Sequence, residues 1–174
     1  RPHRRPAWFR GAYAAILVDR ANALGRVKPC FMLLRFDGTR MTVYVVGTDT
    51  VDTSAALCDY LDHRLDAGDT VHAVNSLPGG DATNATDARD GEDAVTVVQS
   101  RLGTVATVET HQFVRDNDPH EDLLTHADAV DADELVIGIR KRNPTAKIVF
   151  GSTAQAVLLR SARPVAVVPL TEGS

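Results

Sequence analysis

Two glycine-containing turns near the C-terminal end of the sequence contain the residue types that bind phosphate. Gly138 follows an apolar run, and the pair Gly151-Ser152 comes just before the next helical pattern. The basic residues between the turns are Arg140, Lys141, Arg142 and Lys147. Glycine lets backbone N–H groups approach an anion closely, a helix N-terminus offers free N–H groups, and cations balance the charge. Residues 133–170 are therefore predicted to hold an anion-binding segment.

The composition indicates one globular domain that is not embedded in a membrane. The 174 residues, 44% of them hydrophobic and 24% charged, are enough for a sizeable core. No apolar run approaches the roughly 20 residues that a membrane helix needs. We therefore expect no membrane partner.

Charge divides the chain into two parts. Residues 1–40 contain nine Lys/Arg and two Asp, a balance of +7, whereas residues 41–174 contain ten Lys/Arg and 21 Asp/Glu, a balance of −11. The acidic, lysine-poor second part resembles cytoplasmic proteins of salt-loving archaea, in which high charge keeps the protein soluble while salt screens each charge. We therefore expect a cytoplasmic protein of halophilic type.

Residues 1–40 are interpreted as a basic N-terminal extension, mostly irregular. An export signal is disfavoured because Asp19-Arg20 interrupts a short apolar run, and a nucleic-acid-binding arm is a weaker alternative. Met41 opens a strand-like run, and the acidic character begins there. We expect Met41 to be the native start, residues 41–174 to form the domain, and nucleic acid not to be a partner.

From Met41 onward, β-branched apolar runs alternate with helical patterns. Strands are predicted at residues 42–47, 70–76, 106–114, 134–139 and 164–168. Helices are predicted from Asp52 or Thr53 to Gly68, over 91–102, from a cap at Asp118 to about 130, and over 152–161, with a surface loop at 77–90. This alternation predicts a parallel sheet covered by helices on both faces, joined by right-handed crossovers.

The simplest arrangement is an α/β fold with an open, doubly wound sheet of five parallel strands in the order 3-2-1-4-5. Ligands bind to such sheets beyond the carboxyl ends of the strands, where the winding direction reverses. In this order the reversal falls between the first and fourth strands. Asp49 and Gly138 come at the ends of those two strands, so we expect both to face the crevice.

Several segments resemble the universal stress protein family, of the adenine-nucleotide alpha-hydrolase-like superfamily. They are VVGTD after the first strand, VHAVNS in the second, ADELVIG in the fourth, and the closing GSTAQAVLLRSARPVAVV. Nucleotide-binding members have Gly, two residues, Gly, nine residues, then Gly and Ser or Thr. Gly138 and Gly151-Ser152 fall at that spacing, and Lys141 stands where the middle glycine is expected.

The resemblance implies a regulatory, Rossmann-like module that binds ATP, AMP or another adenine nucleotide, with or without Mg²⁺. Asp49 is expected to accept hydrogen bonds from the adenosine or to help hold a metal. The main chain of Ala73 is expected to meet the adenine edge, and Gly138 to let the nucleotide lie against the fourth strand. The phosphates are expected to contact Gly151, Ser152 and Thr153, with Arg140, Lys141 and Lys147 as charge partners.

Two alternatives remain open. A homodimeric interaction protein without nucleotide would pair through the last strand, at Val165, Ala166, Val167 and Val168. A slow ATP hydrolase is less favoured, because the sequence has neither a Gly-x-Ser-x-Gly elbow nor a Gly-Lys-Ser/Thr phosphate loop. We predict no catalytic residues.

The histidine and cysteine spacings predict no metal site. The six histidines show neither a His-x3-His nor a Cys-His pairing, which argues against structural zinc. His120 and His126 are expected on the exposed side of their helix. Cys58 lies in an apolar stretch and is predicted to be a small buried side chain.

Overall fold

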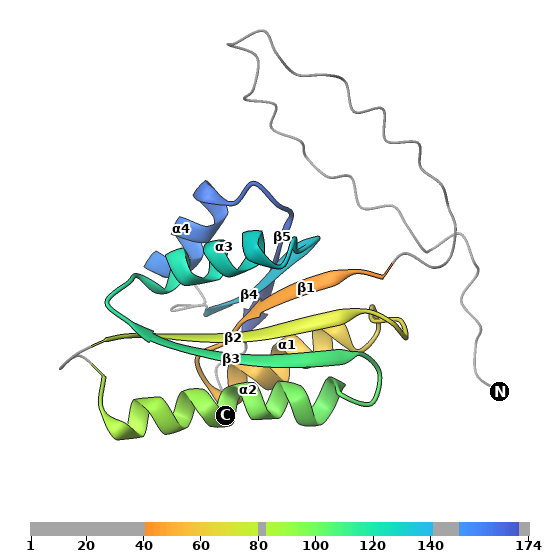
Figure 1. The fold of residues 1–174 in the computed structure, drawn as a ribbon, viewed down its shortest axis with the longest axis horizontal. Coiled ribbons are helices and arrows are strands. Elements are labelled where there is room, and N and C mark those ends of the chain that lie inside the picture. The colour runs from red at the N-terminus through yellow and green to blue at the C-terminus, as the bar shows by residue number, and fades with distance from the viewer. Residues whose placement is uncertain (1–40, 80–82, 141–149, 171–174) are drawn as a thin grey trace, which may run out of the picture. The chain divides into compact units, whose positions relative to one another are not determined.

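The computed structural model describes residues 41–79, 83–140 and 150–170. The elements in chain order are β1 (Val43–Gly47), α1 (Val51–Leu61), β2 (Thr70–Pro78), α2 (Ala85–Leu102), β3 (Thr107–Arg115), α3 (Pro119–Ala129), β4 (Glu134–Arg140), α4 (Ser152–Arg160) and β5 (Val165–Leu170). The strands form one parallel sheet in the order β3-β2-β1-β4-β5 (Figure 1), which confirms the predicted fold class. The prediction for residues 1–40 lies outside the described part of the chain.

Two helices cover each face of the sheet (Figure 1). Alternate strand residues point to opposite faces, so Val46 packs with Leu57 of α1 and Val98 of α2, whereas Val45 packs with Leu123 of α3 on the other side. Each fully buried side chain of this kind contributes about 1.5–3 kcal/mol to folding. The central strands β1 and β4 are buried on both faces and read as continuous apolar runs, whereas the edge strand β3 is polar and largely exposed.

The structure corrects the predicted ends of α1. Its N-cap is Thr50, whose hydroxyl accepts a hydrogen bond from the backbone N–H of Thr53, and the helix ends at Leu61. The predicted stop at Gly68 is a turn in which glycine takes a positive φ of 109°. A turn rather than helix joins Leu61 to that glycine, although the leucine periodicity continues through Leu65, which is buried.

The predicted surface loop at 77–90 is also wrong over part of its length. β2 extends to Pro78, and α2 begins at Ala85, six residues before the predicted start at Gly91. A capping box starts α2: Asn84 accepts from backbone N–H groups, and Asp87 accepts from the backbone N–H of Asn84. The first turns of α2 are polar and lack an apolar period, so periodicity alone missed them.

Helix α3 begins as predicted at Asp118-Pro119, but no side-chain hydrogen bond caps it. Its histidines are not on an exposed side. His120 is buried and lies 2.7 Å, nitrogen to nitrogen, from Arg160 of α4, and the Nε2 atom of His126 is fully buried. The prediction that both point to solvent is therefore wrong.

A hydrogen bond from a buried side chain of β2 helps to fix the backbone at the end of β1. Asn75 is buried, and its side-chain amide donates to the carbonyl oxygen of Thr48 at 3.0 Å. Gln112 donates to the Asn75 carbonyl oxygen at 3.2 Å. Gly91, in the middle of α2, makes room for this pair, since a Cβ there would lie 2.2 Å from Asn75 Oδ1.

Cys58 is buried in the core between α1 and the sheet, as predicted. Burial raises the pKa of its thiol to about 11, an effect that exceeds the opposite influence of Arg101. At neutral pH the thiol is therefore protonated and packs as a small apolar group. Within the described residues, no helix combines the length and hydrophobicity that a membrane crossing requires.

Candidate functional site

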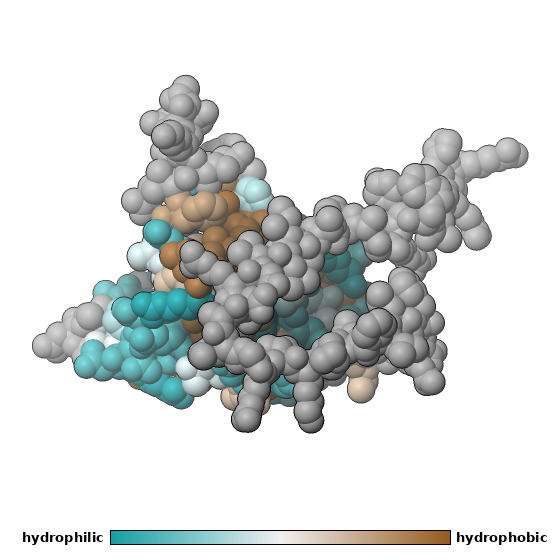
Figure 2. Space-filling view, turned by 90° about the horizontal axis from the view of Figure 1, so that it is seen from above, coloured by the Kyte–Doolittle hydropathy of each residue, from teal (hydrophilic) through white to brown (hydrophobic). Residues whose placement is uncertain are grey.

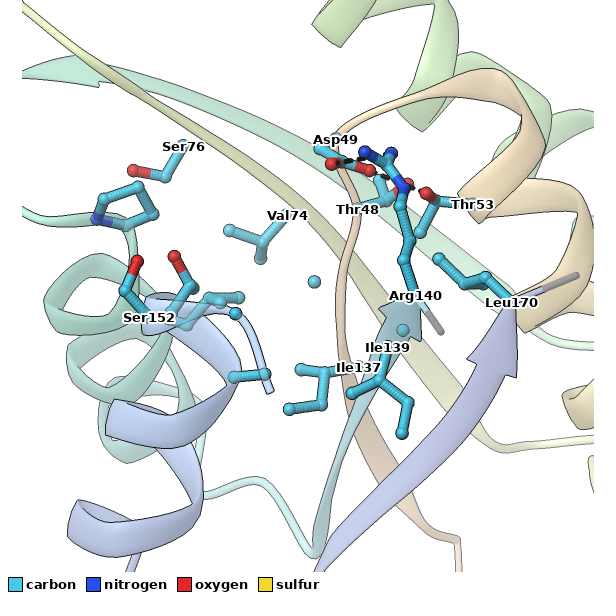
Figure 3. Close-up of a pocket in the computed structure, with 17 residues that line it drawn as sticks. Thr48, Asp49, Thr53, Val74, Ser76, Ile137, Ile139, Arg140, Ser152 and Leu170 are labelled. Carbon is cyan, nitrogen blue, oxygen red and sulfur yellow. Dashed lines mark hydrogen bonds and ion pairs between the residues drawn. The ribbon is translucent and has the colours of Figure 1, made fainter. Parts of the chain in front are cut away.

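A pocket of about 430 Å³ opens at the carboxyl ends of β1 and β4 (Figure 3). The sheet order places it at the point where the winding reverses, because the chain goes from β1 to β2 on one side and from β4 to β5 on the other. Its lining residues are Gly47, Thr48, Asp49, Thr53, Val74, Ser76, Pro119, Leu123, Ile137, Gly138, Ile139, Arg140, Gly151, Ser152, Thr153, Ala154 and Leu170. Its volume lies within the usual range for small-molecule sites, about 300–1,000 Å³.

Asp49 and Arg140 form an ion pair across the top of the pocket. Arg140 Nη2 donates to Asp49 Oδ2 at 3.1 Å, and the Thr53 hydroxyl donates to Asp49 Oδ1 at 2.6 Å (Figure 3). The side chain of Arg140 is 54% exposed and that of Asp49 is 63% exposed. An exposed pair of this kind contributes only about 0–1 kcal/mol. A ligand can therefore separate Asp49 from Arg140 at small cost and recruit both.

The N-terminus of α4 faces the pocket without a side-chain cap. Gly151 is the N-cap residue, and among the described residues no side chain caps the first turn. Its φ of −63° and ψ of 157° suit any residue, and a Cβ there would meet no atom of the described residues within 4 Å. Within this part of the chain, neither backbone strain nor packing requires a glycine here, and its lack of a side chain leaves space in front of the first N–H groups of α4. Such a helix end attracts anions.

Apolar side chains form the wall between these polar groups. In the view of Figure 3, Val74 and Ile137 lie between Ser152 on one side and the Asp49–Arg140 pair on the other. Ser76 also lines the pocket, and its hydroxyl donates to the buried carboxylate of Asp122 at 2.8 Å. The pocket therefore combines an apolar surface that suits a ring system with separate places for hydroxyl groups and for an anion.

The structure brings six of the nine predicted site residues to the pocket: Asp49, Gly138, Arg140, Gly151, Ser152 and Thr153. Lys141 and Lys147 lie outside the described residues. Ala73 is fully buried, and its side chain belongs to the core on the α1 and α2 side of the sheet. Its neighbour Val74 lines the pocket instead, because alternate residues of β2 face opposite ways.

Gly138 has a packing role that the sequence did not suggest. A Cβ at this position would lie 2.9 Å from Leu170 Cδ1, so the glycine admits a side chain of β5. Sequence reasoning also missed Thr48, Thr53 and Ser76. Thr48 and Ser76 stand near the carboxyl ends of β1 and β2, so the rule that selected Asp49 and Gly138 would have found them too.

The fold and the pocket define a doubly wound α/β protein with a ligand crevice at its switch point. The sequence profile of the Universal stress protein family matches residues 41–169. The chain belongs to this family, as its sequence motifs implied.

Individual relatives agree with this assignment. A universal stress protein from Mycolicibacterium smegmatis is 54% identical over 48 residues, which are 28% of this chain and 37% of that relative's length. The solved universal stress protein from Archaeoglobus fulgidus is 34% identical with a TM-score of 0.58, over 75% of this chain and 99% of that one. A structure of the universal stress protein from the same organism in complex with dAMP is 30% identical, with a TM-score of 0.53, over 74% of this chain and 98% of that one.

Proposed function

We propose that the protein is a regulatory module that binds an adenine nucleotide in the pocket between β1 and β4. The observation that carries the proposal is the uncapped N-terminus of α4, which faces an apolar pocket whose other end holds Asp49 and Arg140. The Archaeoglobus fulgidus relative, at 30% identity, was solved with dAMP. Supporting features are thus a place for phosphate, a place for a ring, and a similar protein with an adenine nucleotide.

The proposed pose follows from the chemistry of the lining. The adenine ring packs against the apolar wall near Val74, with its edge toward the main chain of β2 at Ala73. Asp49 leaves Arg140 and accepts hydrogen bonds from ribose hydroxyl groups, or it holds Mg²⁺ together with the phosphates. Among the described lining residues, Asp49 is the carboxylate, and Mg²⁺ sites in nucleotide complexes commonly use one or two.

The phosphates lie at the start of α4. Backbone N–H groups after Gly151 and the hydroxyl groups of Ser152 and Thr153 donate to them. Arg140, once Asp49 has released it, extends across the pocket toward the phosphates, and we expect Lys141 and Lys147, which follow it in the sequence, to add charge. ATP needs more of these cations than AMP, so the basic segment favours the triphosphate.

Calorimetric titration of the full chain with AMP, ATP and cyclic AMP, each with and without Mg²⁺, tests the proposal. We expect saturable 1:1 binding of at least one of them, with ATP gaining affinity from Mg²⁺ if Asp49 holds the metal. A flat titration for all three at high and low salt would reject nucleotide binding and favour a module that works through protein contacts.

The variant Arg140→Ala tests the charged end of the pocket. Loss of one exposed cation should weaken ATP binding about three- to tenfold and AMP binding less, while stability changes by less than about 1 kcal/mol. Arg101→Ala is a matched control, because Arg101 forms a similarly exposed ion pair with Asp59 at 2.5 Å outside the pocket. If the two variants change ATP affinity equally, Arg140 does not contact the phosphates.

We also propose a homodimer in which β5 pairs with its copy across a two-fold axis, through Val165 to Val168. β5 is the last strand in the sheet order, so one of its edges has no partner strand among the described residues. On α4, Leu159 is 76% exposed, and the surface seen in Figure 2 carries a hydrophobic area beside hydrophilic ones. Light scattering coupled to size exclusion should give twice the chain mass, and a monomer at micromolar concentration would contradict the proposal.

The charge of residues 41–174 leads us to propose that the protein works in a cytoplasm of high salt. Ten Lys/Arg against 21 Asp/Glu give strong self-repulsion at low ionic strength. The melting temperature should therefore rise steadily from low to molar KCl, beyond the concentration at which ordinary screening is complete. A melting temperature that is constant above about 0.2 M KCl would contradict a halophilic origin.

A further inference from the structure

Three histidines from three elements meet on the face of the sheet that α3 covers. They are His72 of β2, His111 of β3 and His126 of α3, and one ring nitrogen of each lies within 4.8 Å of the others. His72 Nδ1 and His111 Nε2 are 3.1 Å apart. The ring centroids of His111 and His126 are 4.3 Å apart. None of the three residues lines the nucleotide pocket.

Strand register explains how the cluster forms. His72 stands opposite Glu109 in the β2–β3 ladder, and His111 follows Glu109 by two residues, so all three point to the same face. α3 lies over that face (Figure 1). It brings His126 against the ring of His111. Phe113, two residues further along β3, borders the ring of His126 with centroids 5.7 Å apart. The cluster is therefore set in place by the same packing that builds the core.

One nitrogen of the cluster has no partner in the structure. His126 Nε2 is a fully buried side-chain atom, and among the described residues it makes no hydrogen bond. A buried polar atom left without a hydrogen bond destabilises the folded state. Buried nitrogens in native proteins nearly always have a partner, so this atom points to a bound group that would satisfy it.

Neutral histidine keeps a lone pair on one ring nitrogen, and this is the form that binds a metal. A fourth donor is close, because Glu109 Oε2 lies 3.6 Å from His72 Nδ1 and 3.8 Å from His111 Nε2.

We propose that His72, His111 and His126 bind one divalent transition-metal ion of the zinc type, with Glu109 or water in the fourth position. Imidazole nitrogens with a carboxylate are ligands that Zn²⁺ takes in tetrahedral geometry, with Zn–N bonds of about 2.0–2.1 Å. Two ligands at that distance are about 3.3 Å apart, close to the 3.1 Å between His72 and His111. The separations among the three ligand nitrogens reach up to 4.8 Å, so binding requires the rings to reorient slightly. The ion would join the edge strand β3 to β2 and α3.

Zinc titration of the full chain, without an affinity tag and after treatment with a chelator, tests the site. Calorimetry should give one equivalent of Zn²⁺ per chain, and Co²⁺ should give the visible absorption of a tetrahedral centre. The melting temperature should rise with Zn²⁺, because an ion that binds only the folded state at 100 times its Kd adds about 2.7 kcal/mol. Absence of a stoichiometric site and of any shift in melting temperature would show a hydrogen-bonded histidine cluster without metal.

Two variants and a control locate the ion. His126→Gln and His111→Gln should each lower Zn²⁺ affinity by more than the roughly 10- to 100-fold that loss of an outer-shell partner costs. His63→Ala is the control, since this side chain is 86% exposed and lies outside the cluster. Circular dichroism of the metal-free variants checks folding. Zn²⁺ affinity that is unchanged in both variants, or reduced equally in the control, would overturn the proposal.

Discussion

A Gly151→Val variant is expected to lose more than nine-tenths of its affinity for adenine nucleotide while it folds normally. The backbone at Gly151 already has φ and ψ values that valine adopts, and a Cβ there meets no atom of residues 41–79, 83–140 and 150–170 within 4 Å. The branched side chain would instead stand in front of the free N–H groups of α4, where we place the phosphates. A glycine that neither its conformation nor packing among the described residues explains is a sensitive probe of a ligand.

Calorimetric titration with AMP and ATP, together with thermal unfolding, measures this effect. Valine is a poorer N-cap residue than glycine, so the free energy of unfolding should fall by no more than about 1 kcal/mol. Ala129→Val is a suitable control, because it adds a branched side chain at the exposed end of α3, away from the pocket lining. If Gly151→Val binds nucleotide as tightly as this control, the phosphates do not lie at α4.

Replacing Gly91 by alanine is expected to destabilise the protein, contrary to the usual effect of this change in a helix. Alanine in place of a mid-helix glycine ordinarily stabilises by about 0.5–1 kcal/mol. Here the new methyl group would lie 2.2 Å from Asn75 Oδ1 and 2.6 Å from Gln112 Nε2. Overpacking of this kind costs about 1–3 kcal/mol, so the sign reverses.

Urea denaturation compares Gly91→Ala with Thr96→Ala, an exposed change in the same helix that should stabilise slightly or have no effect. Asn75→Ala removes the side chain that collides with the new methyl group. The double variant should therefore be less destabilised than the sum of the two single variants. A rise in stability on Gly91→Ala would show that Asn75 and Gln112 move aside at no cost. Nucleotide affinity should fall as well, since Asn75 holds the carbonyl of Thr48 at the edge of the pocket.

The sequence was sufficient to predict the sheet and the place of the pocket. Apolar runs set the strands, and the strand order put the ends of β1 and β4 together, which is why Asp49 and Gly138 were placed correctly at the crevice. The assignment to the universal stress protein family, made from local motifs, is confirmed by the match over residues 41–169. Its nucleotide site, in contrast, remains a proposal for this chain.

The features that sequence reasoning missed depend on tertiary contacts, or on which residues of a strand face which side of the sheet. Ala73 and Val74 differ by one position, and only packing decides which of them faces the pocket. His72, His111 and His126 lie far apart in the chain, so no local spacing rule relates them. Helix α2 starts in a polar segment, where an asparagine cap rather than periodicity sets the boundary. In each case the signal is a contact between elements rather than a pattern within one.

The burial of Cys58 gives the chain an internal reporter of its own motions. Thiol reagents attack the thiolate, and a buried thiol with a pKa of about 11 supplies almost none at neutral pH. Modification therefore waits until α1 lifts from the sheet, and its rate measures how often that opening occurs. Because Leu57 beside it packs under β1 and Thr53 of the same helix holds Asp49, a bound nucleotide should slow the labelling. Mass analysis of the peptide that contains Cys58 would read this rate directly, separately from Cys30.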